Sequence, residues 1–142
     1  MTLRTRALEA RLRRLKDVTR RLRRYRDRGA DRLATDEDLA WLVERGLQLG
    51  CEIILDTANH ILAGAFGRSV DTYEQMLDAL AAEAVVSPEL RSDLRGLGGF
   101  RNVLVHDYLE LDPARVIAAL EQAPEQFDRF ASEVHAWLAP RG

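Results

Sequence analysis

The sequence predicts an all-α fold, an antiparallel helical bundle of about five helices joined by short loops. Three observations support this prediction. Apolar residues recur three and four positions apart along most of the 142 residues, which is the spacing of one helix face. No stretch alternates apolar and polar residues in the manner of a half-buried strand. The chain has only 9 Gly and 4 Pro, too few for a turn-dense β-sandwich.

The composition predicts one cytoplasmic domain over residues 1–142. Hydrophobic residues make up 46% of the chain and charged residues 31%, enough for a buried core inside a charged surface. No apolar run approaches the ~20 residues of a membrane span, and the arginine-crowded N-terminus lacks the apolar segment of a secretory signal. The single cysteine, Cys51, cannot form a disulfide within the chain. We therefore expect no membrane partner.

The first expected helix covers about residues 3–27 and is rich in arginine. Its apolar stripe consists of Leu8, Leu12, Leu15, Thr19 and Leu22, and Gly29 follows the helix. Residues 1–28 contain 12 Lys/Arg and 3 Asp/Glu, whereas the remaining 114 residues contain 9 and 20. This local excess of positive charge favours a polyanion such as nucleic acid. Pairing with the acidic remainder or with a partner subunit is an equal alternative.

The second expected helix begins at a capping box, with the Thr35 hydroxyl at the N-cap and a carboxylate three residues later at Asp38. Apolar residues then follow helical spacing from Leu39 to Leu62, and Gly64 and Gly67 end the helix. Gly46 and Gly50 lie on the apolar face. They predict that another backbone approaches closely there.

Three further helices are expected. One starts at Asp71, with Glu74 three residues later. The next begins at Ser87-Pro88, where Ser is the N-cap and Pro the first helical residue. Its apolar seam runs through Leu90, Leu94, Leu97, Arg101, Leu104 and Tyr108. The last helix starts at Asp112-Pro113 and extends to about Trp137, with a bend expected near Pro124.

Residues 101–108 are the main candidates for a functional site. Arg101, His106 and Tyr108 form the spacing R-x4-H-x-Y there. On a straight helix Tyr108 returns to the face of Arg101, whereas His106 lies about 140° away from it. Arg101 and His106 therefore converge only at a helix end, at a distortion, or between two copies of the chain. Three preceding glycines, Gly96, Gly98 and Gly99, indicate tight packing against a partner backbone or an irregularity.

This pair suits attack on an RNA phosphodiester, for which the 2′-hydroxyl supplies the nucleophile. His106 can act as base or acid, and Arg101 can stabilise charge on the phosphoryl oxygens. Asn102 lies four residues before His106 and can orient its imidazole. From spacing alone, a histidine at a helix end and an arginine in an ion pair remain the alternative.

Residues 101–108 resemble the R-x4-H-x-Y motif of the HepT-like toxins, in the HEPN superfamily of ribonucleases. Gly99-Phe100 before the motif, the segment 56–61 (DTANHI) and the segment 44–48 (ERGLQ) are also similar to that family. The resemblance extends over about residues 35–137. The resemblance is specific because the motif, the segment 56–61 and the helix order occur together.

The resemblance implies a homodimer with the active cleft at the interface and metal-independent endonucleolytic RNA cleavage by Arg101 and His106, with Asn102 as support. It also implies a toxin–antitoxin pair of the type VII kind. The antitoxin would be a minimal nucleotidyltransferase that uses ATP to transfer AMP to Tyr108, and the toxin itself would need no cofactor. A bulky anion beside Arg101 would neutralise a phosphate site.

The other polar candidates are weaker. Asp56 and His60 match the family segment and are candidates for supporting the site, with polar contacts inside the bundle as the alternative. We expect His135 to be solvated and Cys51 to be a core residue, and no metal-ligand spacing is present. The alternative function is a non-catalytic helical adaptor subunit of a nucleotidyltransferase.

Overall fold

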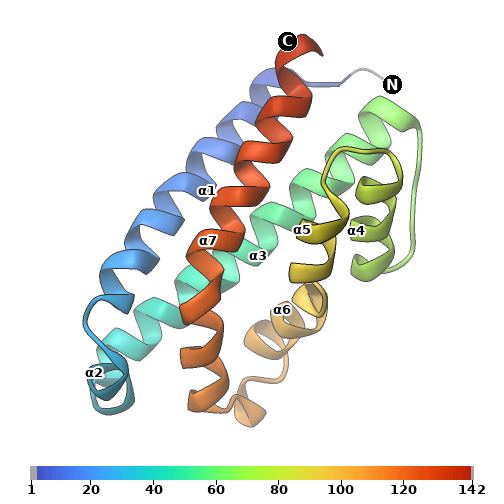
Figure 1. Ribbon diagram of the computed structural model, residues 1–142. Helices are drawn as coiled ribbons and strands as arrows, with labels where there is room; N and C mark the ends of the chain where they lie inside the picture. The colour runs from blue at the N-terminus through green and yellow to red at the C-terminus, as the bar shows by residue number, and fades with distance from the viewer. Residues whose placement is uncertain (1–2, 142) are drawn as a thin grey trace.

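The structure is a computed structural model that describes residues 3–141, and over that range it contains helices and no strand (Figure 1). The elements are α1 (Thr5–Arg26), α2 (Ala30–Thr35), α3 (Glu37–Phe66), α4 (Tyr73–Ala82), α5 (Pro88–Asp93), α6 (Leu97–Val105), the 3-10 helix η1 (Tyr108–Glu110), α7 (Pro113–Leu138) and the 3-10 helix η2 (Ala139–Arg141). The all-α prediction is confirmed. The estimate of about five helices was too low, because α2 was not foreseen and the helix expected from residue 88 is split.

Helices α1, α3 and α7 form the frame of the molecule, with α1 and α7 side by side and α3 crossing behind them (Figure 1). The expected leucine stripe of α1 is buried against these neighbours. At one end of the frame the rings of Phe66 and Trp137 lie 6.0 Å apart between centroids. None of the helices described here is long and apolar enough to cross a membrane.

We expected another backbone to approach the glycines of α3. Side chains of neighbouring helices pack against them instead. A Cβ atom on Gly50 would lie 2.1 Å from Cε2 of Phe127, and one on Gly46 would lie 2.7 Å from Cδ2 of Leu22. Phe127 is a fully buried residue of α7. Gly50 therefore fixes how closely α7 packs on α3, since any larger residue would overlap the Phe127 ring.

Two helix starts differ by one residue from the prediction. Thr35 belongs to the last turn of α2, where its hydroxyl donates to the Asp31 carbonyl, so Asp36 and not Thr35 caps α3 by accepting from the Leu39 N–H. Helix α4 begins after Thr72, not at Asp71, and forms a reciprocal capping box with Gln75. In both cases a neighbouring side chain with the same hydrogen-bonding capacity takes the cap.

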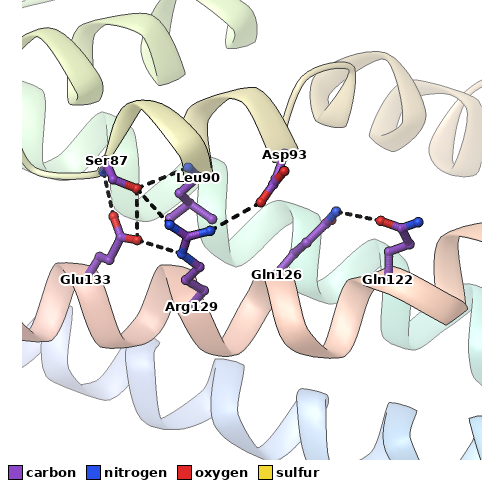
Figure 2. Close-up of polar contacts among 7 residues, drawn as sticks. All are labelled: Ser87, Leu90, Asp93, Gln122, Gln126, Arg129 and Glu133. Carbon is purple, nitrogen blue, oxygen red and sulfur yellow. Dashed lines mark hydrogen bonds and ion pairs between the residues drawn. The ribbon is translucent and has the colours of Figure 1, made fainter.

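The predicted caps of the last two starts are confirmed. Ser87 accepts from the Leu90 N–H at α5, and Asp112 accepts from the Ala114 N–H at α7. Figure 2 shows how α7 holds α5: the Glu133 carboxylate accepts from the Ser87 N–H and hydroxyl, while Arg129 reaches Asp93, Ser87 and Glu133. The α5 end of the segment that leads to the motif is thereby anchored on α7.

The seam expected to run unbroken to Tyr108 is interrupted twice. Gly96 has φ +85°, a conformation that favours glycine, and it separates α5 from α6. Helix α6 then ends at Val105, and Tyr108 lies in η1 with 65% of its surface exposed. The expectation that Tyr108 continues the helix face of Arg101 was wrong, because the helical phase is lost before that residue.

Candidate active site

Arg101 and His106 converge at the C-terminal end of α6. Nη1 of Arg101 lies 3.4 Å from Nε2 of His106. His106 is the C-cap of α6, with its N–H bonded to the Asn102 carbonyl, and its φ of −107° and ψ of −34° depart from regular helix. Of the three routes considered from the sequence, the helix end brings the two side chains together within a single copy of the chain.

The contact is compatible with a basic role for His106. A guanidinium N–H can only donate a hydrogen bond, so the tautomer with a lone pair on Nε2 can accept from Arg101. The same lone pair can accept a proton from a hydroxyl group. His106 is also exposed, whereas the Arg101 side chain retains only 20% of its surface, so a solvent-side ligand meets both groups.

Three side chains hold the guanidinium of Arg101. Glu52 of α3 accepts from Nη2 at 3.2 Å, the Asn102 amide oxygen accepts from Nη1 at 3.2 Å, and the Tyr73 ring centroid lies 5.8 Å from Cζ. We expected the Asn102 side chain to contact the His106 imidazole. It contacts Arg101 instead. Glu52 and Tyr73 were not predicted, although Glu52 is the only charged residue between positions 46 and 55.

The start of α6 is held by Glu74 of α4. Its carboxylate accepts from the Gly96 and Gly98 N–H groups at 3.2 and 3.4 Å, and from Nη2 of Arg91 at 3.1 Å. Arg91 is buried and also donates to Asp78. A Cβ atom on Gly98 would lie 2.6 Å from Cβ of Tyr73, so α6 packs closely on α4. Both features expected of these glycines are present: Gly96 has an irregular backbone conformation, and Gly98 is tightly packed. Gly98 packs against the Tyr73 side chain, however, and not against a backbone.

Two open depressions lie at this site, one lined by Arg101 and the other by the adjacent residue Asn102. One, of about 300 Å³, is lined by Glu52, Leu55, Asp56, Asn59, Tyr73, Met76 and Arg101. The other, of about 440 Å³, is lined by Asp71, Thr72, Tyr73, Glu74, Gly98, Gly99 and Asn102. Asp56 thus lies beside Arg101, while its carboxylate pairs with Arg11 of α1 at 2.6 Å. His60 is half-buried one turn further along α3 and lines neither depression.

The other predicted residues lie as follows. Tyr108 is exposed two residues after His106, next to Leu109, which exposes 89% of its surface. Cys51 is a buried core residue and His135 is exposed, as expected.

Residues 15–134 match the family described as ribonuclease HepT-like. The chain belongs to the HepT-like ribonuclease family. The resemblance identified from the motif and the helix order is confirmed, and the protein is a ribonuclease of this family, related to HepT toxins.

Two relatives match most of this HepT-like chain. It is 27% identical over 118 residues to the tRNA nuclease HepT of Aphanizomenon flos-aquae, which covers 82% of this chain and 80% of that protein. The solved structure of YutE from Bacillus subtilis, a cytosolic protein of unknown function, superposes with a TM-score of 0.84 at 24% identity, covering 99% of this chain and 95% of that one. This similarity supports the fold.

A third HepT-like relative was solved with a partner. The tri-AMPylated HEPN toxin of Shewanella oneidensis, in complex with an MNT antitoxin, superposes with a TM-score of 0.81 at 25% identity. The match covers 91% of this chain and 96% of that toxin.

Proposed function

We propose that this protein is a metal-independent endoribonuclease toxin that cleaves RNA with Arg101 and His106 and is neutralised by AMPylation of Tyr108. The observation that carries the proposal is the 3.4 Å approach of the guanidinium to Nε2 of His106 at the end of α6. An arginine and a histidine that converge beside open depressions suit phosphodiester cleavage, which needs a base and a charge stabiliser.

In the proposed reaction, Nε2 of His106 removes the proton of an RNA 2′-hydroxyl. The 2′-oxygen attacks the adjacent phosphorus, and the bond to the 5′-oxygen of the next nucleotide breaks. The products are a 2′,3′-cyclic phosphate and a 5′-hydroxyl, after the leaving oxygen takes up a proton. Arg101 hydrogen-bonds the phosphoryl oxygens as charge accumulates on them, and Asn102 and Glu52 keep its planar guanidinium aimed at that position.

We place the active cleft at the interface of a homodimer. The reaction needs one proton removed and one delivered, whereas a single copy contributes one histidine to this site. A second copy facing the first would bring a second His106, and the exposed side chains of Tyr108 and Leu109 adjoin the site in sequence. Light scattering at micromolar protein should give the mass of a dimer, and a monomer that cleaves RNA at full rate would refute this arrangement.

The cleavage test uses purified protein, RNA and excess EDTA. Wild-type protein should cleave, and both Arg101→Ala and His106→Ala should lose the activity. Arg95→Ala and His135→Ala serve as controls, since both residues are exposed and lie outside the site. An oligonucleotide with a single 2′-deoxy position should resist cleavage there. Absence of cleavage by the wild type, or equal cleavage by all variants, would contradict the proposal and leave the adaptor function.

The neutralisation test uses co-expression with a cognate minimal nucleotidyltransferase. The exposed Tyr108 hydroxyl can attack the α-phosphorus of ATP, so that tyrosyl-AMP forms and pyrophosphate leaves. Support comes from the AMPylated Shewanella relative and from the position of Tyr108 two residues after His106. Intact mass should increase by one or more AMP groups, and Tyr108→Phe should lose the increase, whereas Tyr25→Phe should keep it. An unmodified toxin in an inactive complex would indicate inhibition by occlusion.

A further inference from the structure

Helix α1 presents a ridge of arginines to solvent. Arg6, Arg13, Arg20 and Arg24 are exposed and recur at intervals of seven, seven and four residues, which places them opposite the buried leucines of α1. The ridge is about 27 Å long at a rise of ~1.5 Å per residue. Among residues 3–141, Arg6, Arg13 and Arg24 form no ion pair, and Arg20 shares Asp17 with Arg14 and Arg21.

Intramolecular pairing leaves most of this charge uncompensated. The first 28 residues contain 12 Lys/Arg and 3 Asp/Glu. Three carboxylates reach α1 from other helices: Asp56 pairs with Arg11, Asp128 with Arg23 and Glu125 with Arg26. Six positive charges remain after all of these acidic groups are counted. Of the alternatives open from the sequence, pairing with the acidic remainder therefore accounts for only a minority of the arginines.

The site itself lacks the charge to attract a polyanion. The two depressions beside Arg101 are lined by four carboxylates, those of Glu52, Asp56, Asp71 and Glu74, and by one cationic side chain, Arg101. Everything after residue 28 has 9 Lys/Arg against 20 Asp/Glu. Three of these carboxylates are paired with arginines, so the lining has little net charge of its own to attract RNA at long range. A ribonuclease with this site therefore gains such attraction from a positive surface elsewhere.

Helix α1 is joined to the site through one ion pair. Asp56 lines the depression that contains Arg101, and its partner Arg11 belongs to α1. Arg11 lies about 140–180° around α1 from the ridge arginines, so this ion pair marks the α3-facing edge of the basic helix and not the ridge itself. A nucleic acid chain bound to the ridge must therefore pass around α1 before it reaches the depression that contains Arg101.

We propose that the arginine ridge of α1 binds the phosphate backbone of the RNA substrate outside the cleavage site. This inference rests on the proposed ribonuclease function. The ridge lacks the apolar centre of a stable protein interface, whereas the exposed apolar side chains, Trp41, Leu42, Tyr108 and Leu109, lie on α3 and η1. A charged surface without such a centre suits phosphates, whose binding by arginine is electrostatic and independent of sequence.

The test compares two variants of equal charge in a His106→Ala background that prevents cleavage. Arg6→Gln/Arg13→Gln/Arg24→Gln removes three ridge arginines, and Arg32→Gln/Arg95→Gln/Arg141→Gln removes three exposed arginines outside α1. The affinity of each for bulk tRNA is measured between 50 and 200 mM salt. Losing three phosphate contacts should lower the slope of log affinity against log salt by about 2 to 3. The unaltered ridge should then lose about 16- to 64-fold more affinity over that range than the ridge variant.

The control triple should keep the parental slope. Equal slopes for both triples would overturn the proposal, because a loss of net charge would then explain the effect. An unchanged tRNA affinity of the ridge variant, together with loss of binding to the nucleotidyltransferase, would overturn it in favour of a protein interface. Failure of EDTA-resistant cleavage would refute the proposed function separately, since this binding measurement needs no cleavage.

Discussion

The carboxylate of Glu74 lies 3.1 Å from Nη2 of Arg91, and it also accepts the N–H groups of Gly96 and Gly98. One side chain of α4 therefore compensates a buried guanidinium and caps the first turn of α6. Because α6 ends at the Arg101–His106 contact, we expect a shift of its first turn to move that contact.

We expect Glu74→Gln to impair both stability and cleavage. The amide compensates Arg91 less well, and a hydrogen bond to a charged group contributes about 1.5–3 kcal/mol. Urea unfolding should show this loss, and kcat should fall at saturating RNA. Asp78→Asn is the matched control, because Asp78 pairs with Arg91 without contacting α6. It should lower stability while leaving the cleavage rate of the folded protein intact, and an equal kcat loss in both variants would contradict the positioning role.

Gly50→Ala should destabilise the bundle, since its methyl group overlaps the buried ring of Phe127 at a cost of about 1–3 kcal/mol. The helix preference of alanine over glycine, about 1 kcal/mol, offsets part of that cost. Gly99→Ala is the control, because a Cβ atom there meets nothing within 4 Å. Equilibrium unfolding should place Gly99→Ala at or above the wild type, and a wild-type midpoint for Gly50→Ala would disprove the tight contact.

Removing Glu52 should slow cleavage, because Arg101 loses a hydrogen-bond acceptor that fixes the orientation of its guanidinium group. Glu52→Ala should lower kcat by about tenfold, equivalent to ~1.4 kcal/mol of transition-state stabilisation. Glu52→Gln keeps an acceptor and should recover part of the rate. Glu44→Gln, two turns earlier on the same helix, should be neutral, and an unaffected kcat in Glu52→Ala would remove Glu52 from the site.

The Cys51 thiol should resist reaction with thiol reagents in the folded protein, because burial raises its pKa to about 12. A chromogenic disulfide reagent at pH 8 should react rapidly only in denaturing urea. The unfolded thiol ionises near its ordinary pKa of about 8.5, so the unfolded state loses its proton first as pH rises. Stability should therefore decrease above about pH 9 more steeply for wild type than for Cys51→Ala, and rapid labelling of folded protein would contradict the burial.

Much of the fold was predictable because its signals are local. The leucine stripe of α1 and the caps at Ser87 and Asp112 each depend on spacing or on a hydrogen bond within a few residues. The misplaced caps at Thr35 and Asp71 show the limit of such signals. Adjacent residues of similar chemistry compete there, and the short helix α2 and the Thr72–Gln75 box decided between them.

The sequence by itself determined the all-α class, the family motif and the two residues proposed to cleave RNA, Arg101 and His106. Only the tertiary structure decided that α6 ends at Val105, which brings those side chains together and leaves Tyr108 exposed. It also supplied Glu52 and Glu74 from helices distant in the chain. The physical reason is range: helical periodicity and capping act within a turn, whereas the guanidinium and the helix end are oriented by carboxylates 22 to 49 residues away.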